Sequence, residues 1–194
     1  MFFAARRLVS FVDKLSYMFD LFRKSSKGPK VIDKVWLSKQ GKLNACAQMV
    51  KIDPSVLLVA WFEETFREIE SLPGLGQNVI KTEHVSYDRV VGRMVVFVEH
   101  YPLLSVEHDL YAKLQLKEVP VLSCLEDPLF MAFGGERTIE AMKNLGLSED
   151  EVIGHSMVTR SIRNAQDKIA EKSSTDYPAT SSKEWFKLNM KETK

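Results

Sequence analysis

Three mostly apolar segments, of which the first is a continuous apolar run, constrain the fold of this chain more than any other feature of its sequence. They cover residues 56–61, 94–98 and 119–125. An apolar run of this length suits a strand that is buried on both faces of a parallel sheet. Patterns typical of helices lie before and between the runs, at 38–50, 63–72 and 106–116. This alternation predicts a three-layer α/β sandwich with right-handed crossovers.

Capping and turn residues indicate where the expected helices and strands begin and end. Ser38 is placed to cap the helix at 38–50, and Pro73 with Gly74 ends the helix at 63–72. A short strand is expected at 79–85. Ser148 and Glu151 form a capping box, which predicts a helix that begins there and continues to 172. After 172 the tail is polar, and we expect it to be loosely ordered.

Composition excludes several classes of protein. The 194 residues include 27 Lys and Arg against 26 Asp and Glu, a net charge of +1, so we expect no nucleic-acid partner. No apolar run approaches the roughly 20 residues that a membrane-spanning helix needs. Cys46 and Cys124 lie far apart without a C-x-x-C motif, which is typical of reduced structural thiols in the cytoplasm.

The first 24 residues have the pattern of an amphipathic helix. An apolar stripe recurs at helical spacing, and residues 1–30 carry seven Lys or Arg against two Asp, a local +5. Such a helix either packs on its own domain or docks on an anionic membrane or a protein partner. The candidate contact residues are Arg6, Arg7, Phe11, Lys14, Phe19 and Phe22. Residues 25–33 are expected to form a linker.

The segment 123–168 contains Leu125-Glu126-Asp127, Glu151-Val152-Ile153 and His155-Ser156-Met157 at fixed spacing. With these motifs it resembles the SecA family, the ATP-driven motors of bacterial preprotein export. The resemblance lies where the second nucleotide-binding domain ends and the long scaffold helix begins. It implies a RecA-like α/β domain at 34–147, a scaffold-like helix at 148–172 and a polar tail at 173–194. The matching positions singled out as structural are Glu126, Asp127, Gly134, Glu136, Arg137, His155, Ser156, Ser161 and Gln166.

The catalytic motifs of that family do not accompany the resemblance. The sequence has no G-x-x-x-x-G-K-S/T phosphate loop. The family's second domain contributes a glycine-rich loop and paired arginines, but here the strand at 94–98 leads into Glu99-His100-Tyr101-Pro102, and residues 112–118 contain no arginine. We therefore expect no ATPase activity by the chain alone, no catalytic residues and no cofactor.

Other candidate sites have simpler explanations. Glu99-His100 and Glu107-His108-Asp109 are expected to form a solvated polar surface, with a zinc site as the alternative. Gly134 and Gly135 are expected to allow a tight turn between packed helices, with an anion site at a helix start as the alternative.

The expected function is that of a non-catalytic SecA-like protein-interaction module. Its partner would be the export machinery or a second copy of itself, and its place the cytoplasm, peripheral at the inner membrane surface. Two alternatives remain open. One is a nucleotide-binding regulator with a residual ATP-type site, and the other is a binding domain unrelated to export. Similarity of fold does not separate these functions.

Overall fold

A five-stranded parallel sheet forms the centre of the computed structural model, which describes residues 29–154 and 156–190. The strand order is β1-β5-β4-β2-β3, and every neighbouring pair is parallel. Parallel neighbours need a crossover on each return, and helices supply these crossovers. The strands are β1 (Lys30–Trp36), β2 (Leu57–Ala60), β3 (Val79–Lys81), β4 (Val95–Phe97) and β5 (Glu118–Cys124).

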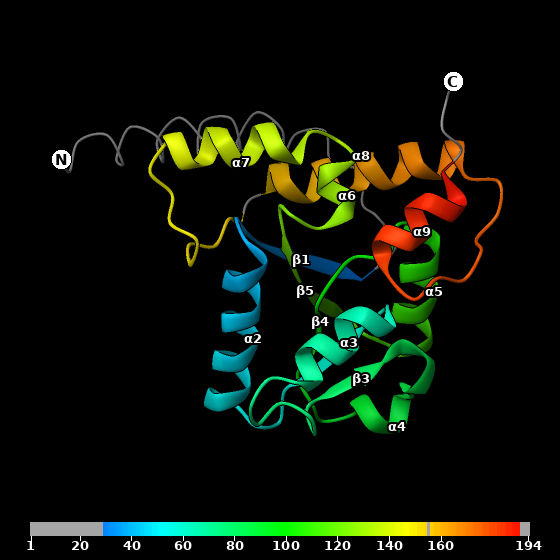
Figure 1. Ribbon diagram of the computed structural model, residues 1–194. Helices are drawn as coiled ribbons and strands as arrows, with labels where there is room; N and C mark the ends of the chain where they lie inside the picture. Colours follow the sequence, from blue (N-terminus) through cyan, green and yellow to red (C-terminus); the bar gives the residue numbers. More distant parts are fainter. Residues whose placement is uncertain (1–28, 155, 191–194) are drawn as a thin grey trace.

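Helices cover both faces of this sheet and its carboxyl edge (Figure 1). One face packs against α2 (Lys39–Ile52) and α3 (Glu63–Glu70), and the other packs against α4 (Tyr87–Val90) and α5 (Leu104–Lys113). Four further helices follow β5: α6 (Pro128–Met131), α7 (Gly135–Asn144), α8 (Ser156–Lys172) and α9 (Ser182–Asn189). The predicted RecA-like three-layer α/β fold is confirmed. Within the described part of the chain, no helix is both long and apolar enough to span a membrane.

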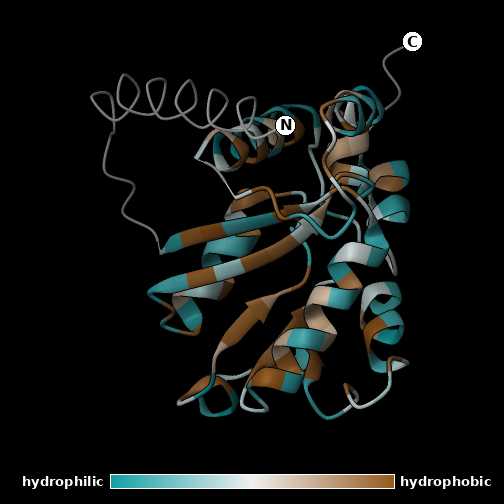
Figure 2. Cartoon of the chain, turned by 90° about the vertical axis from the view of Figure 1, so that its left-hand side faces the viewer, coloured by the Kyte–Doolittle hydropathy of each residue, from teal (hydrophilic) through white to brown (hydrophobic). Residues whose placement is uncertain are grey.

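Burial on both faces explains the unbroken apolar runs. Leu58 and Val96 point into the cluster under α2 and α3, whereas Val59 and Phe97 point into the cluster under α5. All four side chains are fully buried. Figure 2 shows the central strands coloured mostly as hydrophobic, while the helices alternate hydrophobic and hydrophilic residues. The expected strands at 56–61 and 94–98 are therefore confirmed in their centres.

The capped helix after β1 forms as predicted. The Ser38 side chain accepts a hydrogen bond from the Gly41 backbone N–H at 3.2 Å, which satisfies one of the free donors of the first turn. Leu43, Cys46 and Val50 then recur on the face that packs on the sheet.

A third apolar cluster lies beyond the carboxyl ends of the strands, where α8 and α9 pack. It joins Val35 and Leu125 to Ile162 and Ile169 of α8 and to Trp185 of α9. Trp185 is fully buried, and its indole N–H donates to Asp176 at 2.6 Å. The loosely ordered tail expected after 172 is thus wrong over α9, because one buried tryptophan holds a short helix whose own pattern is weak.

Two other boundaries differ from expectation. The linker expected at 25–33 is wrong over residues 30–33, which pair with β5 as part of β1; residues 25–28 lie outside the described part. The strand expected at 79–85 ends at Lys81, and a single 3₁₀ turn, Thr82–His84, follows it.

The helix expected from Ser148 begins instead at Ser156. The capping-box contact is present, since the Ser148 N–H donates to Glu151 at 3.3 Å, but no helix follows it directly. Val35 and Ile153 instead exchange two backbone hydrogen bonds, at 3.0 and 2.7 Å. This antiparallel bridge to the edge strand holds the segment extended and delays the helix.

Truncation of Leu58 tests the two-face burial of β2. We expect Leu58→Ala to lower the free energy of unfolding by about 2–5 kcal/mol, because it opens a cavity under a fully buried side chain. Urea denaturation measures this loss. Ile52→Ala, at a side chain that is 84% exposed, is the control and should change stability by less than about 0.5 kcal/mol. Equal losses would contradict the assignment of β2 as a central strand.

Candidate functional site

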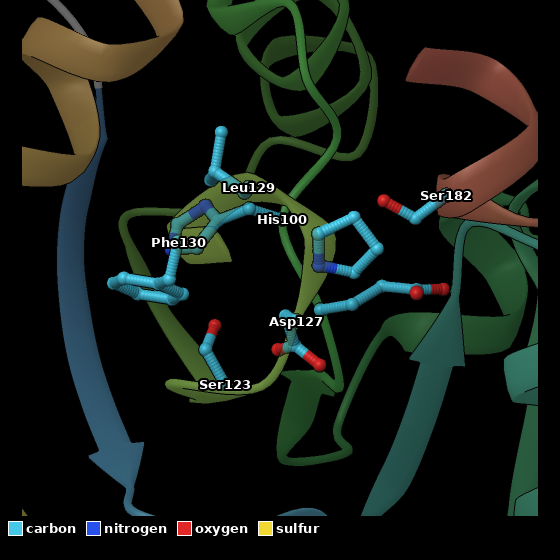
Figure 3. Close-up of a pocket in the computed structure, with 8 residues that line it drawn as sticks. His100, Ser123, Asp127, Leu129, Phe130 and Ser182 are labelled. Atoms are coloured by element: carbon cyan, nitrogen blue, oxygen red, sulfur yellow. The ribbon is translucent and has the colours of Figure 1, made fainter. Parts of the chain in front are cut away.

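The carboxyl edge of the sheet is the place to look for a site, because open parallel sheets bind ligands there. Several polar side chains follow the strands at this edge: Lys42 on α2 after β1, Glu99 and His100 after β4, and Asp127 after β5. Figure 3 shows His100, Ser123 and Asp127 around a small cavity, with Ser182 of α9 beside them.

Asp127 is the centre of one network. Its carboxylate accepts the Cys124 N–H at 2.8 Å and lies 2.9 Å from the Lys42 ammonium, whose side chain is only 3% exposed. The Cys124 thiol donates to the same carboxylate at 3.1 Å. Burial alone would lower the pKa of Lys42, but Asp127 more than offsets this and raises it. Lys42 is therefore a buried ammonium ion that ties α2 to the end of β5.

Glu99 is the centre of a second network. One of its oxygens accepts the backbone N–H groups of Trp61 and Phe62, at 2.9 and 3.0 Å. The other accepts the Thr65 hydroxyl at 2.6 Å. Burial raises the pKa of Glu99 to about 7, and the charge of Lys42 opposes this rise. Both oxygens are used inside the fold, where they join β4 to the start of α3.

His100 lies between two carboxylates. Its Nδ1 is 2.9 Å from Glu107 of α5, and its Nε2 is 2.9 Å from Asp33 of β1. Burial by itself would lower the pKa of His100, but Glu107 and Asp33 more than offset it and raise the pKa to about 10. The ring is thus a buried imidazolium that connects three elements.

The expectation of a solvated surface at these residues is wrong for three of them. Glu99, His100 and Glu107 are 5%, 6% and 1% exposed. The physical reason is that each group finds charged or backbone partners inside the fold, which offset the cost of burial. Both ring nitrogens of His100 are engaged by carboxylates. In the described residues no cluster of His, Cys, Asp and Glu is arranged to hold a metal ion.

The cavity at this edge is very small. Its volume is about 20 Å³, and it is lined by Glu99, His100, Ser123, Asp127, Pro128, Leu129, Phe130 and Ser182. A cavity of this size accommodates a single water molecule. Small-molecule sites typically need about 300–1,000 Å³. Residues of α6 and α9 close the edge over the strands. The charged groups below them have partners inside the fold, whereas the buried Ser123 hydroxyl has no hydrogen-bond partner among the described residues.

A larger hollow lies next to this edge, between α6, α7 and α8. Its volume is about 300 Å³. We call it the α7/α8 groove, and it is lined by Val35, Leu125, Leu129, Phe130, Phe133, Gly135, Thr138, Met142, Ile153, Met157, Val158, Ser161, Ile162 and Ala165. Thr138 and Ser161 supply polar side chains, and among the described residues no charged side chain lines it. This composition suits an apolar ligand and does not suit phosphate.

The positions singled out by the SecA resemblance surround this groove and the closed edge. Asp127 forms the ion pair with Lys42, Glu126 accepts the Lys39 N–H at 2.7 Å, and Gln166 donates to the Tyr101 carbonyl at 2.8 Å. Ser161 lines the groove. The remaining positions are Ser156 at the exposed start of α8, Glu136 and Arg137 in the exposed first turn of α7, and His155, which lies outside the described residues.

The predicted tight turn at the two glycines is confirmed. Gly134 has a φ of +90°, which side chains rarely adopt, and it precedes α7. A Cβ at Gly135 would meet the Leu125 carbonyl oxygen at 2.9 Å. The candidate contact residues Arg6, Arg7, Phe11, Lys14, Phe19 and Phe22 lie outside the described residues.

Sequence reasoning missed Lys42, Asp33 and the buried state of Glu99 and His100. One signal was present, since Glu99 and His100 directly follow a buried strand and so must lie at the carboxyl edge. Lys42 gave no such signal, because its partner Asp127 is 85 residues away in the chain.

The buried imidazolium of His100 predicts that the stability of the protein depends on pH. The folded protein keeps a proton on His100 up to about pH 10, whereas the unfolded chain releases it near 6.5. The free energy of unfolding should therefore fall as pH rises above about 6.5. Urea denaturation between about pH 7 and 8.5 measures this fall. Glu99, with a pKa of about 7, adds to it at the lower end of this range, and the thiols, which ionise near about 8.5 in the unfolded chain, add to it at the upper end, so the contribution of His100 is read from the comparison with its variant.

His100→Gln should reduce the decrease in the free energy of unfolding with rising pH. His84→Gln, at an exposed histidine, should leave this decrease unchanged. If His100→Gln does not fold, the imidazole proton resonances of the unchanged protein report the same property. A ring that titrates near pH 6.5 would contradict the charged triad.

No family model matches the chain. The protein translocase subunit SecA of Psychrobacter arcticus is 29% identical over 122 residues, which cover 59% of this chain and 13% of the relative. SecA of Alkaliphilus oremlandii is 34% identical over 91 residues, 45% of this chain and 10% of the relative.

A shorter and more similar match comes from SecA of Acinetobacter baumannii, which is 53% identical over 45 residues. That match covers 23% of this chain and 5% of the relative. The chain thus spans only about a tenth of the length of the curated relatives it matches. Over part of its length, this chain is related to the protein translocase subunit SecA.

Proposed function

We propose that this protein is a non-catalytic SecA-like interaction module linked to preprotein export. The sequence similarity to SecA supports a role related to protein translocation. The non-catalytic part of the proposal depends on one observation, the closed carboxyl edge of the sheet. A cavity of about 20 Å³ is far too small for a nucleotide.

The polar groups at this edge support the same conclusion. Catalysis by a buried Lys, Glu or His requires that the group reach a substrate. Here Lys42 is paired with Asp127, Glu99 with two backbone N–H groups and Thr65, and His100 with Asp33 and Glu107. These groups hold α2, α3, α5 and the strands together.

A nucleotide-binding regulator has less support. The α7/α8 groove is large enough for part of a nucleotide, but no charged side chain from residues 29–154 or 156–190 lines it. Phosphate sites in proteins use Lys, Arg or converging backbone N–H groups. The groove instead has the character of a protein-binding surface, with an apolar lining and partly exposed apolar residues such as Phe133 at 40%.

The proposed setting is the cytoplasmic side of the inner membrane, with the export machinery or a second copy of the chain as partner. The basic, apolar-striped segment 1–24 is proposed as the contact with an anionic membrane. Nucleic acid is not proposed as a partner, since the net charge is only +1.

Calorimetric titration tests the proposed function. We expect no saturable heat with Mg-ATP at millimolar concentrations, because the closed edge gives a triphosphate no site. A purified full-length SecA should bind the protein saturably in the same instrument, and an unrelated protein of similar net charge is the control. Clear saturation with Mg-ATP would overturn the non-catalytic proposal, and no heat with any export component would overturn the export link.

Vesicle co-sedimentation tests the membrane contact. We expect the protein to bind anionic vesicles at low salt, and Arg6→Glu with Arg7→Glu to weaken this strongly, since each basic residue contributes about 1 kcal/mol. Lys113→Glu with Lys117→Glu makes the same change in net charge at exposed positions of the body and should have little effect. Absence of binding by the unchanged protein would exclude the membrane contact.

A further inference from the structure

We infer that the α7/α8 groove binds this chain's own N-terminal segment through the apolar stripe at Leu8, Phe11, Val12, Leu15, Met18, Phe19 and Phe22. This inference does not rest on the proposed function. It concerns what covers the groove when neither membrane nor partner is present.

The groove is a hollow of about 300 Å³ that the described residues leave open. Leu129 and Ile162 form part of its buried lining, and Phe133, 40% exposed, lies at its margin. Another apolar side chain of the lining, Met157, is 52% exposed. An apolar surface of this kind next to a hollow is typical of a binding site.

The shape of the groove suits a helix. It lies between the two helices α7 and α8, with α6 and the end of β1 beneath them. Amphipathic helices bind such grooves by apolar residues at i, i+3, i+4 and i+7. The stripe follows this spacing: Leu8, Phe11, Val12 and Leu15 form its first two turns, and Met18, Phe19 and Phe22 continue it.

The length of chain before β1 allows the stripe to reach the groove. Val35 of β1 lines the groove, and Lys30 lies roughly 17 Å before it along the strand. Residues 23–29 span up to about 25 Å when extended, so Phe22 can return over that distance. From Leu8 to Phe22 a helix is roughly 21 Å long, which is comparable to α7 and α8.

Covalent attachment favours the chain's own segment over a second copy. A short flexible connection gives an effective concentration in the millimolar range, whereas a second copy must bind at its concentration in solution. Binding of the same stripe to a membrane would compete with its binding to the groove, so the test is made without vesicles.

Thiol labelling tests the occupancy of the groove. Both natural cysteines are fully buried, so Thr138→Cys places one reactive thiol on the exposed margin of the groove. In this background we expect Leu15→Asp with Phe19→Asp to raise the rate of maleimide labelling about tenfold, because it releases the covering segment. Ser10→Asp with Tyr17→Asp is the matched control. It adds the same charge opposite the stripe and should leave the rate unchanged.

Two results would overturn the inference. The first is an equal labelling rate for Thr138→Cys alone and for Thr138→Cys combined with Leu15→Asp and Phe19→Asp. This result would mean that residues 8–22 do not cover the groove. A protection that increases with protein concentration would assign the groove to a second copy of the chain. Circular dichroism of each variant verifies that the fold persists. Neither result depends on binding to export proteins, so failure here leaves the proposed function standing.

Discussion

Burial of both faces of the central strands is the constraint on which the rest of this structure depends. With Leu58, Val59, Val96 and Phe97 fully buried, the sheet needs a helical layer on each side. The parallel pairing then brings the carboxyl ends of β1, β5, β4 and β2 to one edge. Every polar residue that follows a strand must therefore lie near the others, and the fold has to pair these groups or expose them to a ligand.

In this protein the fold pairs the charged groups of this edge. Asp127 with Lys42, Glu99 with the start of α3, and His100 between Asp33 and Glu107 each join two or three elements. The remaining space is about 20 Å³, and α6 and α9 lie over it. A position that serves as a ligand site in other open α/β sheets is here part of the structural framework, which is why the proposed function is interaction and not catalysis.

The surface available for interaction lies beside that edge. Helices α6, α7 and α8 come from the part of the chain that resembles SecA, and they enclose the apolar groove. Glycines 134 and 135 permit the sharp entry into α7, and the bridge between Val35 and Ile153 sets where α8 begins. The glycine turn and this bridge together set the positions of α7 and α8 on either side of the groove. The apolar lining of the groove fits an apolar occupant.

From the sequence alone we could predict the parallel α/β class, the N-cap at Ser38, the glycine turn and the resemblance to SecA. These depend on short-range patterns and on local identity, which one chain displays directly. The tertiary structure alone decided that Lys42 meets Asp127, that His100 is enclosed by Asp33 and Glu107, that Trp185 anchors α9, and that the helix after Ser148 is delayed. Each of these depends on partners far apart in the chain, whose burial and charge become defined only when the sheet and helices pack.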